Sequence, residues 1–365
     1  MQVRQITQYL ESIAPLAFQE SYDNAGLIIG GPEDEVSGIL ISLDITEQIV
    51  DEAISKHLNL IVSHHPIIFS GLKKLNGKNY IERSVAKAIK NDIAIYAAHT
   101  NLDSVFGGVN SKICEKLNLL NCRILSPGID LLKKLVTFVP LAQADQVRKA
   151  LFDAGAGSIG NYDSCSFKAN GTGTFRGNDQ SNPFVGKKNQ LHLEEETRLE
   201  TIFPKHIQAR VIQALLNAHP YEEVAYDIYP LDNEYAQAGI GMIGELAEPM
   251  EELIFLTQLK AVFNCNVIKH TQLLGKSISR VAVCGGSGSS YLKLAIAQKA
   301  DIFISGDFKY HQFFDAEQQI IIADIGHYES EQFTKEVFYE LLTKNFPKFA
   351  IHLSEFSTNP VSYLI

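Results

Sequence analysis

Two adjacent histidines, His64 and His65, end a short apolar run and stand directly before Pro66. The run is typical of a buried strand, and Pro66 keeps a helix from beginning through the pair. Neighbouring side chains of a strand point to opposite faces, so we do not expect the two imidazoles to bind the same ion. The pair therefore indicates either hydrogen-bonded histidines at a strand end or one ligand for each ion of a two-metal site.

Two later stretches also place histidine and carboxylate side chains directly behind apolar runs. His99 and Asp103 follow the run at residues 93–98, and His327 and Glu331 follow the run at residues 320–324. His327 and Glu331 are four positions apart, so one turn of a helix brings them together. We therefore expect five donors to converge: His64, His65, Asp103, His327 and Glu331.

Imidazole and carboxylate donors without thiolate suit divalent zinc, iron, manganese or nickel, with zinc the leading expectation. Five donors are too many for one open four-coordinate site, but they suit two ions bridged by a carboxylate. Two ions about 3.5–4 Å apart polarise a substrate oxygen and lower the pKa of bound water from about 15.7 towards 7. Hydrolysis is the chemistry expected if this is an enzyme, and the same donors can hold metal without turnover.

A glycine-rich stretch lies between the apolar strand at residues 280–284 and an apolar helix. Its backbone amides can hold an anion, and a tight strand-to-helix turn explains the glycines as well. The spacing matches neither the dinucleotide fingerprint nor the phosphate loop. The residues expected to bind the anion are Gly285, Gly286, Ser287 and Gly288.

Three further residues near the metal stretches are acid–base candidates: Asp307, His311 and Glu329. Asp307 and His311 are four positions apart and can share a helical face. Either can orient a metal-bound imidazole, and capping of the helix explains Asp307 equally well.

Apolar strands separated by amphipathic helices organise both ends of the chain. This alternation indicates an α/β fold with mixed, mostly parallel sheets flanked by helices. Ligands of such sheets gather outside the carboxyl ends of the strands. We therefore expect all three metal stretches to lie at one edge of one sheet.

The pattern breaks near residue 127, at Ser126, Pro127 and Gly128. Residues 135–231 follow the strand and helix order of a ferredoxin-like βαββαβ module, with a mobile loop expected over residues 170–183. We expect residues 1–127 and 238–365 to form the two halves of one core, and residues 128–237 to form a domain inserted between them.

Composition sets the remaining limits. A chain of 365 residues indicates two domains, and a net charge of -10 disfavours nucleic acid as a partner. The five cysteines are scattered, which indicates a reducing compartment without a disulfide framework. No apolar run approaches the roughly 20 residues that cross a membrane. The N-terminus lacks the apolar region of a signal peptide, so a cytoplasmic location is expected.

In combination, these stretches resemble the GTP cyclohydrolase I type 2 homologues, also called the NIF-three-like family. The resemblance covers nearly the whole chain and is carried by residues 22–27, 63–66, 99–103, 306–307 and 326–331. It implies a dinuclear metal centre at His64, His65, Asp103, His327 and Glu331. It also implies a ring-shaped homohexamer, a trimer of dimers.

The inserted segment looks like the PII and CutA-type proteins, because residues 219–223 are similar to the CutA-type signature. The family name implies GTP cyclohydrolase activity, which opens the guanine ring hydrolytically and releases formate. Our first hypothesis is a dinuclear, metal-dependent hydrolase of a nucleotide-like substrate. The alternative is a non-catalytic regulatory or scaffold hexamer whose PII-like insert binds an effector or a protein partner.

Overall fold

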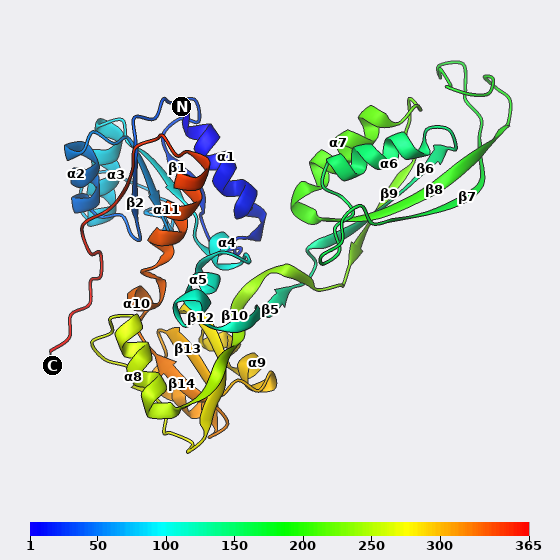
Figure 1. Cartoon of the computed structure of the whole chain (residues 1–365). Helices are drawn as coiled ribbons and strands as arrows, with labels where there is room; N and C mark the ends of the chain where they lie inside the picture. The colour runs from blue at the N-terminus through cyan, green and yellow to red at the C-terminus, as the bar shows by residue number, and fades with distance from the viewer. Residues whose placement is uncertain (365) are drawn as a thin grey trace. The chain divides into compact units, whose positions relative to one another are not determined.

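In a computed structural model, which describes residues 1–364, the chain divides into two compact units (Figure 1). The core unit combines Met1–Pro127 with Gln237–Ile365, and the insert unit is Gly128–Ala236. Both ends of the chain therefore contribute to the core unit, while a single continuous segment makes the insert unit.

The first sheet of the core unit has five strands, of which all but β1 run parallel to their neighbours. In spatial order they are β1 (Gly26–Ile29), β4 (Ala94–Ala97), β3 (Leu60–Ser63), β2 (Ile39–Ser42) and β15 (Ile351–Leu353). One face packs on α2 (Glu47–Ser55) and α3 (Tyr80–Lys90). Thr46 caps α2 by accepting a hydrogen bond from the backbone amide of Ile49.

The second sheet has six strands, with β12, β13 and β14 parallel at its centre. In spatial order they are β11 (Lys269–His270), β14 (Ile321–Asp324), β13 (Ile302–Gly306), β12 (Ser277–Ser287), β10 (Tyr235–Glu251) and β5 (Leu120–Gly128). Its outer face packs on α9 (Leu292–Ala297), the 3-10 helix η4 (Tyr310–Ala316) and their flanking residues.

One hydrophobic core joins the inner faces of both sheets. It also includes side chains of α1 (Val3–Ile13), α5 (Val109–Lys116), α8 (Glu252–Val262) and α11 (Thr334–Asn345). The prediction of a single sheet edge is therefore wrong: the metal stretches follow strands of two sheets. Because β5 joins the second sheet and β15 returns to the first, each half of the sequence contributes to both sheets.

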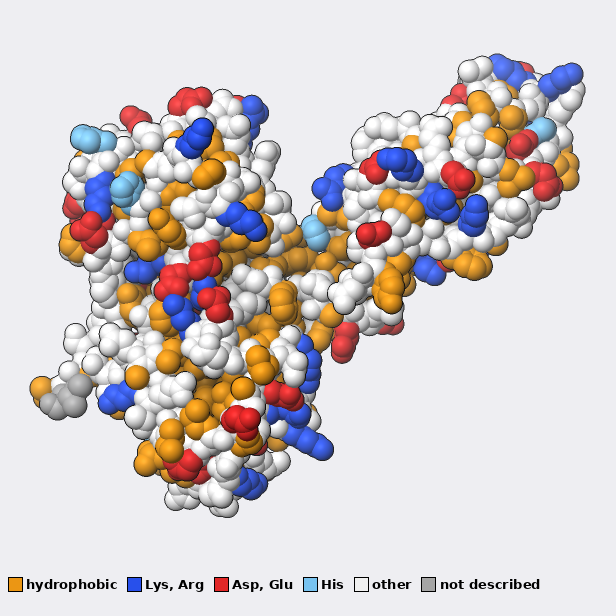
Figure 2. Space-filling model, viewed as in Figure 1, with side chains coloured by type: hydrophobic (Ala, Val, Ile, Leu, Met, Phe, Trp, Pro, Cys, Tyr) orange, Lys and Arg blue, Asp and Glu red, His pale blue; other side chains and the backbone are white. Residues whose placement is uncertain are grey.

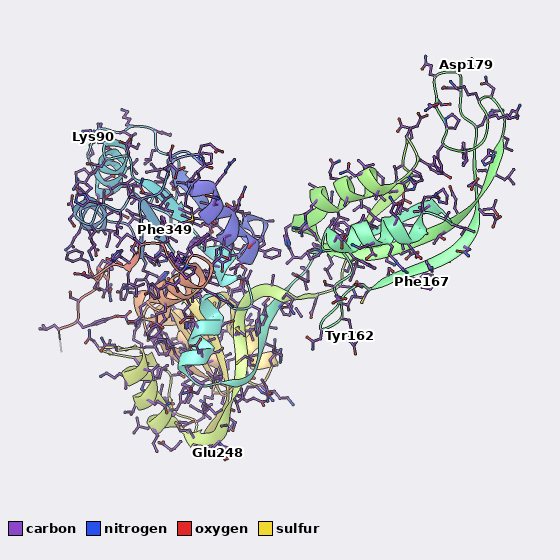
Figure 3. All side chains as sticks on the ribbon, turned by 45° about the horizontal axis from the view of Figure 1, so that its top comes forward. Lys90, Tyr162, Phe167, Asp179, Glu248 and Phe349 are labelled. Atoms are coloured by element: carbon purple, nitrogen blue, oxygen red, sulfur yellow. The ribbon has the colours of Figure 1, made fainter. Side chains whose placement is uncertain are left out.

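The insert unit is a four-stranded antiparallel sheet with two helices that share its core. In chain order its elements are β6 (Leu132–Pro140), α6 (Ala144–Asp153), β7 (Ser166–Phe175), β8 (His192–Pro204), α7 (Gln208–Ala218) and β9 (Tyr226–Leu231). Residues 170–175 were expected to be a loop, but they belong to β7 and pair with β8. Backbone hydrogen bonds form this ladder, so the glycine-rich composition does not prevent it. On the same strand, Phe167 is exposed (Figure 3).

The distribution of surface charges and the state of the cysteines match what the composition predicts. Acidic and basic side chains are interspersed over the face seen in Figure 2. The five cysteines are free thiols, and three of them are buried. Among residues 1–364, no helix has the length and apolar character needed to span a membrane.

Candidate metal centre

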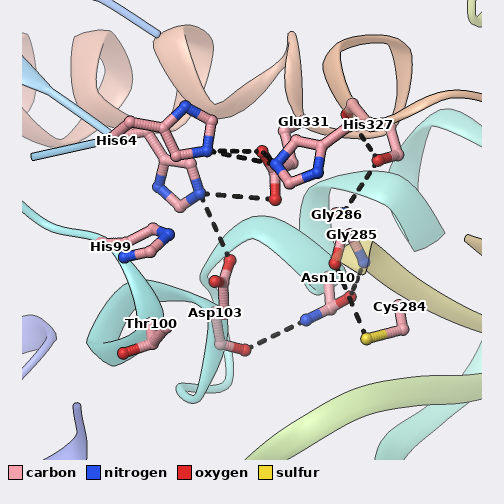
Figure 4. A network of polar contacts seen from close by, with 12 residues as sticks. His64, His99, Thr100, Asp103, Asn110, Cys284, Gly285, Gly286, His327 and Glu331 are labelled. Carbon is pink, nitrogen blue, oxygen red and sulfur yellow. Dashed lines mark hydrogen bonds and ion pairs between the residues drawn. The ribbon is translucent and has the colours of Figure 1, made fainter. Parts of the chain in front are cut away.

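The ends of three strands bring the predicted donors together inside the core unit (Figure 4). His64 and His65 follow β3 directly. Asp103 ends the short helix α4 (Thr100–Asp103) after β4, and His327 and Glu331 bound the short helix α10 (His327–Glu331) after β14. The predicted convergence of these five side chains is therefore present in the structure.

Glu331 lies at the centre of this cluster, with only 3% of its surface exposed. Its Oε1 is 3.7 Å from Nε2 of His64, and its Oε2 is 3.0 Å from Nε2 of His65. Nε2 of His327 lies 3.1 Å from the same Oε2. One carboxylate therefore faces two groups of donors, one with each oxygen.

The two groups are His65, His327 and Glu331 on one side, and His64, Asp103 and Glu331 on the other. In the first, Nε2 of His65 and Nε2 of His327 lie 3.3 Å apart. Two donors about 2.0–2.1 Å from one tetrahedral ion are about 3.3 Å apart, so this spacing suits zinc. In the second group, Nε2 of His64 lies 3.6 Å from Oδ1 of Asp103.

Three atoms of the cluster are buried polar atoms without a well-directed hydrogen bond to any described residue. They are Nε2 of His64, Oδ1 of Asp103 and Oε2 of Glu331. Leaving such atoms unpaired costs free energy, and buried polar atoms in folded proteins are generally satisfied. Nε2 of His64 and Oδ1 of Asp103 belong to the second group, whereas Oε2 of Glu331 faces the first, so the unpaired atoms fit one cation in each group.

Acceptors behind the imidazoles fix their orientation. Nδ1 of His65 lies 2.7 Å from Oδ1 of Asp44, and Nδ1 of His327 lies 2.7 Å from Oδ2 of Asp307. Nδ1 of His64 lies 2.9 Å from the carbonyl oxygen of Ala98. In a metal-bound state each Nδ1 would keep its proton and donate it outward, which would leave the Nε2 lone pair for the ion.

The electrostatics of the cluster are dominated by burial and by Glu331. Burial lowers the pKa of His64. For His65, burial also lowers the pKa, but hydrogen bonds to Asp44 and Glu331 outweigh it and raise the pKa to about 10. For His327 the same balance raises the pKa to about 9. Burial and the charge of Glu331 raise the pKa of Asp103.

His99 is a sixth side chain of the cluster and is not among the five predicted donors. It forms a possible metal-holding group with His64 and His65. Its Nδ1 lies 2.8 Å from Oδ1 of Asp23, which also accepts hydrogen bonds from Thr100. Burial raises the pKa of Asp23, but these bonds outweigh it and lower the pKa to about 2. The position of His99 directly after β4 was the signal that could have identified it.

The three acid–base candidates occupy different places. Asp307 orients His327. It lies before η4, which begins at Tyr310, and its φ of 59° is not helical. The prediction that Asp307 and His311 share a helical face is therefore wrong. Asp307 does not cap η4 either, because Lys309 holds that position. The exposed ring of His311 packs against Tyr310 and Phe314. Only Glu329, on α10, is buried beside the cluster.

The glycine-rich stretch does not present free amides to an anion. The amide of Gly285 donates to Asn110, that of Gly286 to Ser330, and that of Gly288 to Ser305, each at 2.9 Å. The anion site predicted at Gly285, Gly286, Ser287 and Gly288 is therefore not supported. These glycines make room instead: a Cβ on Gly286 would lie 2.3 Å from Oε1 of Glu331.

Fold and cluster together define a mixed α/β protein with a histidine–carboxylate centre where two sheets meet. The chain belongs to the Duf34/NIF3 (NGG1p interacting factor 3) family, whose model matches residues 1–360. It is 40% identical over 367 residues to the GTP cyclohydrolase 1 type 2 homolog of Bacillus subtilis, covering 99% of this chain and 98% of that protein. It is 41% identical over 341 residues to the protein of the same name from Halalkalibacterium halodurans, covering 93% and 91%.

Solved structures agree with this placement. A Bacillus cereus protein related to NIF3 matches with a TM-score of 0.86 and 40% identity, covering 100% of this chain and 99% of that one. A Staphylococcus aureus protein matches with a TM-score of 0.79 and 28% identity, with the same coverage. The family resemblance and the mixed α/β fold predicted from the sequence are confirmed.

Proposed function

We propose that this protein is a metal-dependent hydrolase that holds two divalent ions in the cluster. His65, His327 and Glu331 would hold one ion, and His64, Asp103 and Glu331 the other. The observation that carries the proposal is the pair of donor groups that share the carboxylate of Glu331, with three buried donor atoms left unsatisfied among them. Zinc is the leading ion, while iron, manganese and nickel prefer similar donors.

The donor set favours a hydrolytic centre over a thiolate site. Cys284 is the cysteine drawn near the cluster in Figure 4, but it belongs to none of the metal-holding groups among the described residues. Burial raises the pKa of its thiol, with a further contribution from Asp103. It therefore stays protonated, and the ions would be held by nitrogen and oxygen alone.

The substrate class comes from the relatives, which are named GTP cyclohydrolase 1 type 2 homologs. Hydrolysis of a ring carbon–nitrogen bond adds the hydroxyl of water to carbon and its proton to nitrogen. Divalent ions at this site would supply the activated water and polarise the substrate. Asp44 and Asp307 hold His65 and His327 in place, and Glu329, which lines the cavity beside them, would transfer the proton.

Turnover by metal-loaded protein tests the proposal. A panel of nucleotides and free heterocycles is incubated with wild type and with Glu331→Gln, and products are separated by chromatography. We expect wild type to turn over a ring compound and Glu331→Gln to lose this turnover. The control Glu248→Gln, which changes an exposed side chain on β10, should retain the turnover. No turnover by metal-loaded wild type, while an established cyclohydrolase works in parallel, would reject the enzymatic proposal.

A second candidate is a regulatory or scaffold role, which one feature of the insert unit favours. This unit holds a cavity of about 680 Å³, large enough for a small effector. Six of the residues that line it combine aromatic and charged groups: Phe138, Phe175, Phe184, Glu196, Arg198 and Tyr221. Such a lining suits an effector with an aromatic ring and polar substituents.

Removal of the insert separates the two candidates. A variant in which a short glycine–serine linker replaces residues 130–235 keeps the core unit, which is a compact unit by itself. Unchanged turnover would support the hydrolase. Loss of effector or partner binding with the metal retained would support the regulator.

We also propose that the protein assembles as a homohexamer, a trimer of dimers, in the cytoplasm. The proposal rests on the family resemblance. Mass in solution tests the assembly: six copies of the 40.5 kDa chain support it, and a stable monomer contradicts it.

A further inference from the structure

A cavity of about 320 Å³ opens onto the metal centre on the side of His65 and His327. Pockets for small molecules range from about 300 to about 1,000 Å³, so this one suits a compact ligand. Both imidazoles line it, so a ligand inside it lies next to one of the proposed ion positions.

The C-terminal segment forms one wall of this cavity. Asn359, Val361 and Tyr363 line it. Two hydrogen bonds fix the segment: Thr358 donates to Oδ2 of Asp44 at 2.5 Å, and Asn359 donates to Oε1 of Glu329 at 3.0 Å. The wall is therefore fastened to residues beside both imidazoles.

Apart from the proposed ions, the side-chain charges around the cavity disfavour a phosphate chain. Its walls include four carboxylates: Asp44, Asp307, Asp324 and Glu329. Lys269 is the basic side chain of the lining, and its ammonium is paired with Asp324 at 2.5 Å. The nearby amides of the glycine stretch donate within the chain, so they offer nothing to phosphate oxygens either.

The same walls suit an uncharged ring that carries N–H groups. Glu329 lines the cavity, and its Oε1 accepts a hydrogen bond from Asn359, whereas its Oε2 is not fully buried and can face a ligand. A carboxylate oxygen at the wall of a cavity is a strong acceptor for an N–H group of a ligand. Apolar side chains of Leu43, Val267 and Val361 complete the lining and can pack on the faces of a ring.

We propose that this cavity is the substrate pocket and that it selects an uncharged N–H-bearing heterocycle, a base or nucleoside, over the same heterocycle with a phosphate chain. The inference rests on the proposed function of the cluster. Glu329 is the residue that determines this specificity, and the C-terminal segment limits the size of the ligand.

Equilibrium dialysis of metal-loaded protein against guanosine and against GTP tests the proposal. We expect guanosine to bind at least about tenfold more tightly than GTP. Glu329→Gln should weaken guanosine binding at least about tenfold, because a carboxylate acceptor is stronger than an amide. The matched exchange Glu248→Gln changes an exposed side chain (Figure 3) and should have no effect.

A second variant is needed because Glu329 shares α10 with His327 and Glu331, so Glu329→Gln could also disturb the metal ligands. Val361→Trp fills the cavity from the exposed C-terminal segment, so it should block guanosine while the metal content stays unchanged. The proposal is overturned if GTP binds as tightly as guanosine, or if Val361→Trp binds guanosine like wild type. Guanosine binding by a protein that takes up no metal would contradict the proposed hydrolase and leave the pocket assignment intact.

Discussion

Nε2 of His65 and Nε2 of His327 lie 3.3 Å apart, although 262 positions separate the two residues in the chain. Both atoms face Oε2 of Glu331. Without metal, the pKa of His65 is raised to about 10 and that of His327 to about 9, so both imidazoles carry protons at neutral pH. A cation that binds here must displace these protons.

The first prediction is that metal binding strengthens as the pH rises. Between about pH 6.5 and about pH 8.5, each released proton should increase the affinity by up to about tenfold per pH unit. The linkage to stability has the opposite sign: protonated His65 stabilises the metal-free fold below its unfolded pKa of about 6.5, and this is lost as the pH rises through about 10. Competition with a chelator at several pH values measures the affinity. An affinity independent of pH would contradict this account.

A second prediction concerns the shared carboxylate. Glu331→Gln removes the charge that both donor groups face, so the metal content should fall from two ions to at most one per chain. Elemental analysis gives the content directly. Glu248→Gln, which changes an exposed carboxylate, should retain both ions. Two ions in Glu331→Gln would show that this residue is not a bridge.

The third prediction uses two glycines with similar backbone conformations. Gly286 has a φ of 61° and Gly275 a φ of 71°, so alanine strains both positions alike. A Cβ at Gly286 would lie 2.3 Å from Oε1 of Glu331, whereas a Cβ at Gly275 meets nothing within 4 Å. Gly286→Ala should therefore lose metal and Gly275→Ala should keep it. Equal metal contents in the two variants would be the contrary result.

A fourth prediction concerns the residue behind His65. Asp44→Asn weakens the acceptor that orients this imidazole, so metal affinity should fall by about 10- to 100-fold. Asp51→Asn is the control, because Asp51 is exposed on α2 and pairs with Lys87. Chelator competition at one pH compares the two variants. An unchanged affinity in Asp44→Asn would mean that packing alone orients His65.

The donors could be predicted from the sequence because each lies within a few residues of the end of an apolar strand: His64 and His65 directly follow β3, and Asp103 and Glu331 end short helices after β4 and β14. The two-sheet arrangement could not, because β5 and β15 join sheets built mainly from the other half of the sequence. The glycine stretch was misjudged because the side chains that occupy its amides are distant. Asn110, for example, is 175 positions from Gly285. The contact that orients His99 could not be predicted either, because its partner Asp23 is 76 positions away.

X-ray absorption at the metal edge, on protein purified without added metal, tests the central claim most directly. The account predicts two ions per chain about 3.5–4 Å apart, with nitrogen and oxygen ligands and no sulfur. A single ion, a sulfur ligand, or no bound metal in the folded protein would contradict it.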